Sequence, residues 1–545
     1  MTMSTLKKYY IFIFAFFIFF VAYIPNIYEW SLKSILPSNR TFNWDEHIYT
    51  YDYNIYLSKI RQGQEGHNLI VDKYDGNPNQ KGVFLQMLYL LTGKLTRPFG
   101  ISPESAFFIL RSIVSFLWIL VIVNICIYYL EKPVAYSLGV VLSFLAASFP
   151  VFFFYNNEWW VTYFMNWWTE MDSLKRIAYI PHYTLNYIFV SIFSILIYKN
   201  QIALLCLLLA VSIFIHPAGA ILLFFSWALY QSIHVVLFKR FKNVNYKKII
   251  LNTVCIFLSI IIPLLYIKYV TTSYPWKTLT DYDINHRLGV DVREYVLSLG
   301  PVFFTGMAGV ILVIIQKKTK LLSLVTWVLG AFLAIYVFRF FPLQSELRFV
   351  QTANHIPLAI LSAYFLTFVF KKYHHILVRS LIIIFIIAFM ILGSVQIFFS
   401  IKSQNDFNHQ KAAAVLPLVP YPPQMMYPLT DFYNGLQWLK NNTKKTDVVL
   451  SEITAGNYIP AYSGNFVFIG HESETPFFDE KSPQADMFFS GEMEKDKAFS
   501  FLKSKNISYV FFGPQEQEKN KKNINYDFLK TVYKSNFVII FEVTK

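Results

Sequence analysis

Two adjacent carboxylates, Asp45 and Glu46, follow the first long apolar stretch of the sequence. A carboxylate just outside a membrane is placed to accept the proton of a hydroxyl or amine while that group attacks a sugar held on a lipid phosphate. Alternatively, the pair adds negative charge to the N-terminus of a following helix and stabilises its dipole. The residue types alone leave both interpretations open.

A second pair of acids, Glu170 and Asp172, lies in a segment at about 155–182 that is rich in Trp and Asn. Carboxylate oxygens on such a loop suit Mg²⁺, Mn²⁺ or Ca²⁺, so a divalent cation is one expectation here. The alternative is that the carboxylates only help to hold an acceptor. The tryptophans of this segment favour an aromatic belt at the membrane interface.

Cationic residues near apolar stretches are candidates for binding a phosphate leaving group, which needs positive charge for its stabilisation. Arg348, Arg176 and His216 fit this description. Arg348 follows Glu346, so an ion pair within that short segment is the alternative role. His216 precedes Pro217 between two apolar runs, where a helix break is expected and where a lone histidine also serves as a structural residue.

A polar turn near the C-terminus contains His471 and Glu472 directly after a predicted strand. These two residues are candidates for contacting an acceptor, with an ordinary polar loop as the alternative.

The composition is that of a polytopic membrane protein. The chain has 545 residues, 55% of them hydrophobic and only 15% charged, whereas soluble proteins are about 25% charged. This excludes a disordered chain and a typical soluble enzyme. Lys and Arg exceed Asp and Glu by 48 − 33 = 15, but the excess falls on short loops between apolar stretches. It therefore reports membrane topology and not nucleic-acid binding.

Apolar stretches of suitable length predict eleven membrane spans. They lie near residues 9–28, 105–130, 134–154, 183–198, 202–215, 217–238, 249–270, 296–316, 321–340, 354–370 and 376–400. The positive-inside rule then places the N-terminus in the cytoplasm and the last segment outside. We expect an integral protein of a bacterial plasma membrane.

The outer segments predict two kinds of structure. Within the first outer loop, 29–104, apolar residues recur at helical spacing over 48–61 and 83–95, which predicts two interfacial amphipathic helices. Helix and strand patterns alternate in the C-terminal segment, which predicts a small soluble α/β domain. The expected domains are thus a transmembrane domain, 1–400, and an extracytoplasmic domain, 401–545.

This layout resembles the GT-C superfamily of polytopic glycosyltransferases, which includes protein O-mannosyltransferases and the aminoarabinose transferase of lipid A. The resemblance is carried by Trp44-Asp45-Glu46, by the two helices of the first loop and by the outer C-terminal domain. It implies an inverting transfer of a sugar from a polyprenyl-phosphate donor to a glycan, lipid or protein acceptor. It also implies that the first-loop acid is the general base.

Two other functions are compatible with the sequence. One is a transporter or flippase for lipid-linked saccharides, although such proteins typically have paired halves with broken helices and this chain has only one such break. The other is a membrane scaffold without catalytic activity.

Overall fold

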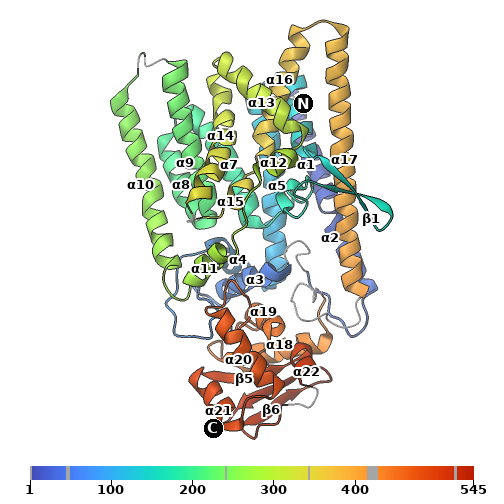
Figure 1. Cartoon of the computed structure of the whole chain (residues 1–545), viewed down its shortest axis with the longest axis vertical. Helices are drawn as coiled ribbons and strands as arrows, with labels where there is room; N and C mark the ends of the chain where they lie inside the picture. Colours follow the sequence, from blue (N-terminus) through green and yellow to red (C-terminus); the bar gives the residue numbers. More distant parts are fainter. Residues whose placement is uncertain are drawn as a thin grey trace. The chain divides into compact units, whose positions relative to one another are not determined.

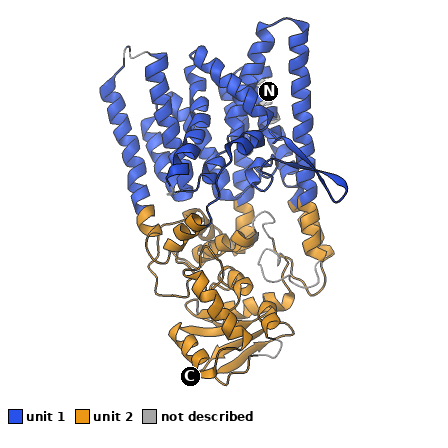
Figure 2. Cartoon of the chain, viewed as in Figure 1, with its two compact units in different colours: residues 1–25, 111–266, 286–403 blue, residues 26–110, 267–285, 404–545 orange. Residues whose placement is uncertain are grey.

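The computed structural model is mostly helical and is that of an integral membrane protein (Figure 1). It describes residues 3–44, 50–239, 242, 244–341, 344–413, 427–520 and 524–544. Asp45 and Glu46 lie outside the described residues. The chain forms two compact units (Figure 2). Unit 1 comprises 1–25, 111–266 and 286–403, and unit 2 comprises 26–110, 267–285 and 404–545.

Unit 1 is a bundle of apolar helices. Its helices, with the full bounds of those that continue into residues of unit 2, are α1 (Met3–Ala22), α5 (Pro103–Leu130), α6 (Pro133–Leu145), α7 (Pro181–Lys199), α8 (Ile202–Ile215), α9 (Pro217–Ile233), α10 (Tyr246–Thr271), α12 (Val292–Leu299), α13 (Pro301–Ile315), α14 (Thr319–Phe340), α15 (Leu347–Val350), α16 (His355–Lys372) and α17 (Ile376–Ala413).

Close helix packing in this bundle depends on small residues, as is usual in membranes. Gly306 of α13 faces the backbone of Leu358 on α16, and Gly309 faces Leu361 one turn further along. A Cβ atom at either glycine would overlap the α16 backbone, so the two helices approach each other only because these positions are glycines.

The described helices that are long and apolar enough to cross a membrane are fewer than the eleven spans expected. Five described helices are long and apolar enough to cross a membrane, or seven if each of two bent pairs is one span. One bent pair joins α1 to α2 (Ile24–Ser31) at 50°, and the other joins α12 to α13 at 92°. The predicted eleven spans are therefore not confirmed, although most of the predicted stretches are helices.

The stretch expected as a span at 134–154 is only partly helical. Helix α6 ends at Leu145, and the chain then forms an antiparallel hairpin of β1 (Pro150–Tyr155) and β2 (Glu158–Tyr163). Phe, Tyr and Trp side chains on this hairpin are exposed on both faces, and Figure 1 shows it extending from the helices of unit 1. The sequence did not predict the hairpin because the stretch is continuously apolar and aromatic. Such a run has no periodicity that distinguishes a helix from a strand.

Unit 2 contains the first-loop helices and a C-terminal α/β region. Its helices are α2, α3 (Thr50–Gln64), α4 (Met87–Thr96), α11 (Lys277–Asn285), α18 (Thr430–Asn442), α19 (Ile453–Tyr462), α20 (Phe478–Ser490), α21 (Lys495–Ser504) and α22 (Pro514–Lys519). The five-stranded sheet has the order β4-β3-β5-β7-β6, with β3 parallel to β4 and β5 and with β7 antiparallel to its neighbours. The strands are β3 (Val448–Leu450), β4 (Phe466–Val467), β5 (Ile507–Phe512), β6 (Leu529–Lys534) and β7 (Ile539–Val543).

Helix α3, the first of the two helices predicted in the outer loop, is largely buried within unit 2. It packs against α4 and α19, and its residues 53–63 are all buried. Two of its buried polar side chains have partners within unit 2: Asn54 donates to Asn457 Oδ1 at 2.7 Å, and Gln62 donates to the Val71 carbonyl at 3.1 Å. The apolar spacing predicted the helix correctly, but partners distant in sequence determine its burial.

Candidate functional site

Asp45 and Glu46, the two candidates for the general base, lie outside the described residues. The described residues on both sides of them have contacts within unit 2. The Trp44 ring stacks on Phe108 at 4.7 Å between centroids. The carbonyl of Trp44 accepts a hydrogen bond from the Tyr53 hydroxyl at 2.9 Å. Helix α3 begins at Thr50. The described residues on either side of 45–49 are therefore held by an aromatic contact at Trp44 and by the buried helix α3.

The two acceptor-side candidates contact the start of α3. His471 is 3% exposed, and its Nε2 lies 3.2 Å from Oδ1 of Asp52. The Ser473 backbone N–H donates to His471 Nδ1 at 3.2 Å, so a neutral imidazole carries its proton on Nε2 and donates it to Asp52. The Glu472 backbone N–H donates to the Tyr51 hydroxyl at 3.0 Å. Asp52 and Tyr51 thus join the candidate site, although the sequence interpretation did not include them.

Aromatic stacking makes this cluster rigid. The Tyr51 ring lies 3.9 Å from the His471 ring at an interplanar angle of 16°. Burial raises the pKa of Tyr51 well above its usual range, which keeps its hydroxyl neutral. The sequence did offer one indication for Asp52, since it lies close to Asp45 and Glu46 and near the start of the helix predicted over 48–61.

A buried network of charges lies beside this cluster and links α3 to the C-terminal region. Lys59 Nζ lies 3.0 Å from Glu474 Oε1, with both side chains 4% exposed, and it also donates to Gln86 Oε1 at 2.5 Å. The Tyr274 hydroxyl donates to Asp75 at 2.5 Å. Burial raises the pKa of the Asp72 carboxyl well above its usual range, and the charges of Glu474 and Asp75 add to this.

We expect Lys59→Met to destabilise unit 2 by about 3 kcal/mol, because it leaves the buried Glu474 carboxylate without its cation. Thermal unfolding of the purified protein in detergent measures the loss. The matched control is Lys277→Met, since Lys277 pairs with Asp281 in an exposed (i, i+4) contact at 3.5 Å, which contributes little. Equal melting of the two variants would contradict a structural role for the Lys59–Glu474 pair.

In unit 1, Glu170 is fully buried. Its Oε1 accepts the backbone N–H of Ala353 at 2.6 Å, and its Oε2 accepts the Tyr187 hydroxyl at 3.1 Å. Burial raises the pKa of Glu170 to about 8, while the charge of Arg176 opposes this shift. Both oxygens already have protein partners, so the geometry favours a structural link between the second loop and the 351–354 segment.

The pKa of Glu170 predicts a specific pH dependence of stability. The folded state holds the carboxyl proton up to about pH 8, whereas the unfolded state loses it near the usual 4.5. The free energy of unfolding therefore falls as pH rises through this window. We expect Glu170→Gln, which carries no charge at any pH, to lose less stability than wild type between about pH 5 and about pH 8.5. Melting curves test this with the exposed Glu158→Gln as control, and parallel curves for wild type and Glu170→Gln would refute it.

The other second-loop candidates also have local partners. Asp172 is half-buried, and its Oδ1 accepts the backbone N–H groups of Leu174 and Lys175, both at 2.9 Å. Arg176 is buried and donates from Nη2 to the Ala146 carbonyl at 2.6 Å. Burial lowers the pKa of Arg176 to about 10, and Glu170 and Asp172 counteract this.

The second loop does not have the geometry of a cation site. The oxygens of Glu170 and the Oδ1 of Asp172 already accept protein hydrogen bonds. Over the ranges that the structure describes, no group of three or more His, Cys, Asp or Glu residues is arranged to hold a metal ion. The described residues thus show no clear site for the predicted divalent cation.

Arg348 and His216 lie around one tyrosine of α7. Arg348 Nη1 donates to the Tyr183 hydroxyl at 2.6 Å, and the Tyr183 ring lies 4.9 Å from the His216 ring. His216 separates α8 from α9, and its Nδ1 accepts the Gly219 N–H at 2.9 Å. The helix break predicted at His216-Pro217 is present. Arg348, Tyr183 and His216, which we call the tyrosine cluster, form a polar group at the ends of α7, α9 and α15.

No protein-family model and no curated protein sequence matches this chain. Among solved structures, it is similar to the archaeal oligosaccharyltransferase AglB from Archaeoglobus fulgidus in complex with an inhibitory peptide and a dolichol-phosphate. The TM-score is 0.53 at 15% identity, over 94% of this chain and 70% of that one. It is also similar to AglB in complex with Zn and sulfate, with a TM-score of 0.50 at 16% identity over 91% and 68%.

A second similar protein is ArnT from Cupriavidus metallidurans in the apo state, with a TM-score of 0.50 at 10% identity over 100% of this chain and 99% of that one. AglB and the aminoarabinose transferase ArnT are both members of the GT-C superfamily. The fold that this resemblance implied is confirmed, because the chain shares the fold of AglB and of ArnT over nearly its whole length.

Proposed function

We propose that this protein is a membrane glycosyltransferase that moves a sugar from a polyprenyl-phosphate donor to an extracytoplasmic glycan, lipid or protein. The observation that carries the proposal is the shared fold with AglB over 94% of the chain. The dolichol-phosphate in that AglB complex supports a donor of the same class. The ArnT fold supports it independently, because it matches the chain from end to end.

The proposed reaction is a single inverting displacement. The acceptor oxygen attacks the anomeric carbon of the sugar, and the bond between that carbon and the phosphate oxygen breaks. The acceptor proton passes to Asp45, with Glu46 as the alternative base. The electron pair leaves with the polyprenyl phosphate.

We assign the leaving phosphate to the tyrosine cluster. Arg348 Nη1 donates to the Tyr183 hydroxyl at 2.6 Å, and a guanidinium is the side chain suited to bidentate binding of a phosphate. The Tyr183 and His216 rings lie against each other. Arg176, which the sequence also suggested for this role, donates from Nη2 to the Ala146 carbonyl at 2.6 Å, and it remains the second candidate for the phosphate.

The acceptor is assigned to the cluster of Tyr51, Asp52, His471 and Glu472. Asp52 is 43% exposed, and its carboxylate is oriented by the His471 imidazole, so it can accept a hydrogen bond from an acceptor hydroxyl. We further propose that 401–545 is an extracytoplasmic domain of a bacterial plasma-membrane protein, with the N-terminus in the cytoplasm. No step of the proposal depends on a metal ion.

The test is a donor panel. Purified protein in nanodiscs receives radiolabelled polyprenyl-phosphate sugars together with a membrane extract as the acceptor source. The proposal predicts covalent transfer of label from at least one donor, and none from boiled protein. Movement of intact donor across proteoliposome membranes without transfer would instead support a flippase.

A further inference from the structure

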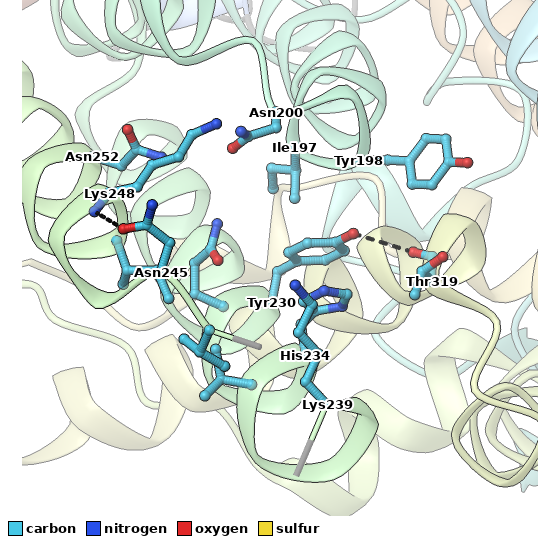
Figure 3. Close-up of a pocket in the computed structure, with 14 residues that line it drawn as sticks. Ile197, Tyr198, Asn200, Tyr230, His234, Lys239, Asn245, Lys248, Asn252 and Thr319 are labelled. Atoms are coloured by element: carbon cyan, nitrogen blue, oxygen red, sulfur yellow. Dashed lines mark hydrogen bonds between the residues drawn. The ribbon is translucent and has the colours of Figure 1, made fainter. Parts of the chain in front are cut away.

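A pocket lies at one end of the unit 1 helices, among the C-terminal turns of α7 and α9 and the first turns of α10 and α14. It has a volume of about 340 Å³. Figure 3 shows the side chains that line it. None of the residues assigned above to the donor or the acceptor lines this pocket, so its role is separate from the proposed reaction.

The polar lining of the pocket is cationic. Lys239 and Lys248 both line it, together with the amides of Asn200 and Asn252, and no carboxylate is among the described residues of its lining. In Figure 3 the amino group of Lys248 points toward Asn200. Lysines supply positive charge and amides supply further donors, and this is the chemistry that recognises a phosphate group.

The pocket wall is held in place by local structure. The Tyr230 hydroxyl donates to the Thr319 carbonyl at 3.4 Å, which links α9 to the start of α14. The helix then continues from α9 as a π-helical turn, His234–Phe238, and such turns are frequent at functional sites. The wide turn places His234 and Val235 in the pocket lining.

The surroundings of the pocket are apolar in the manner of a lipid-facing surface. Along α10, directly after Lys248, the side chains of Ile250, Leu251 and Val254 are 62%, 63% and 47% exposed. A cationic pocket beside such a surface suits a molecule that carries both a phosphate and long apolar chains. Basic pockets between membrane helices bind the head groups of anionic lipids in this way.

From this geometry we propose that the pocket binds the phosphate group of an anionic membrane lipid. The basic loops around it predict that it lies on the cytoplasmic side. Positive loops alone would be explained by membrane topology. Lys239 and Lys248 differ from lysines that only set the topology, because both line a cavity that also contains amide donors. The shared chemistry is a phosphate on a lipid, which either an anionic glycerophospholipid or a polyprenyl phosphate would supply.

The test compares two double variants with the same loss of charge. Lys239→Gln/Lys248→Gln removes the pocket lysines, whereas Lys242→Gln/Lys247→Gln removes two exposed lysines of the same stretch that do not line the pocket. Binding to the full-length protein in detergent is measured by native mass spectrometry and by the shift in melting temperature. The probes are phosphatidylglycerol, phosphatidylcholine, undecaprenyl phosphate and inorganic phosphate.

We expect wild type and the control to bind phosphatidylglycerol or undecaprenyl phosphate, and the pocket variant to bind about thirtyfold more weakly, since each lysine near an anionic head group contributes substantially. Whichever of the two lipids binds identifies the source of the phosphate. Equal weakening in both double variants, equal binding of phosphatidylcholine, or binding of inorganic phosphate alone would overturn the proposal.

A variant without any change of charge tests whether weaker lipid binding is due only to the loss of positive charge. Asn252→Leu removes an amide from the pocket and should weaken lipid binding severalfold while the protein remains monodisperse in gel filtration. The cavity is not the binding site if both Asn252→Leu and the pocket variant bind the two lipids as wild type does. The two lipids are phosphatidylglycerol and undecaprenyl phosphate.

Discussion

Asp45→Asn is expected to lower the turnover number for sugar transfer by at least about a hundredfold, because a positioned general base contributes on the order of 10²–10⁴ to such a step. Asparagine has nearly the same shape as aspartate but cannot take the acceptor proton. The KM for the lipid donor should change little, since the base does not bind the phosphate. Initial rates with purified protein and the best donor measure both constants.

Glu46→Gln is the matched control for this prediction, since it removes the adjacent charge of the same segment. We expect it to retain most of the activity. If Glu46→Gln abolishes transfer and Asp45→Asn does not, Glu46 is the general base in place of Asp45. If both variants keep full activity, neither carboxylate is the base.

Arg348→Met should have the second largest effect. Removal of one preorganised donor to a developing charge costs about a hundredfold or more in rate, and Arg348 is the member of the tyrosine cluster with a permanent charge. We expect kcat to fall more than the affinity for the donor, because the phosphate gains charge only as the bond to the sugar breaks. Arg348→Lys should recover part of the rate.

Arg293→Gln provides the charge control, since Arg293 is exposed near the N-terminus of α12. It should behave as wild type in the same assay. Similar losses in Arg348→Met and Arg293→Gln would indicate an effect of overall charge and would contradict a phosphate ligand at Arg348.

Much of the helical architecture could be predicted from the sequence, because long apolar runs bounded by lysines require membrane helices. The run at 202–215 is α8 with the same bounds, and 217–238 is α9 with its π-helical turn. The bend between α12 and α13 was not predicted. Gly300 there has a φ of +69° and precedes Pro301, so the chain turns within a continuously apolar segment.

The C-terminal region was also predictable in outline. The alternation of helix and strand patterns indicated a small α/β domain, and apolar runs of strand length lie at β3, β4, β5 and β7. Strand β6 (Leu529–Lys534) was missed because its alternation of polar and apolar residues is weak and it carries two lysines.

The site was less predictable, because spacing along the chain does not reveal partners that are distant in sequence. Arg348 and His216 lie 132 positions apart in the sequence, yet both contact Tyr183. Asp52 contacts His471 across more than four hundred residues. Glu170 looked like a loop carboxylate, yet a backbone N–H and a tyrosine hydroxyl hold it in the core. Such partners become visible only once the helices are packed.

The most direct test of glycosyl transfer is a single-turnover measurement with purified wild type and a doubly labelled donor, one label in the sugar and one in the lipid. If the protein transfers the sugar, glycosylated acceptor and free polyprenyl phosphate form in equal amounts and at the same rate. Donor that remains intact while it crosses the bilayer, with no free polyprenyl phosphate released, would contradict it.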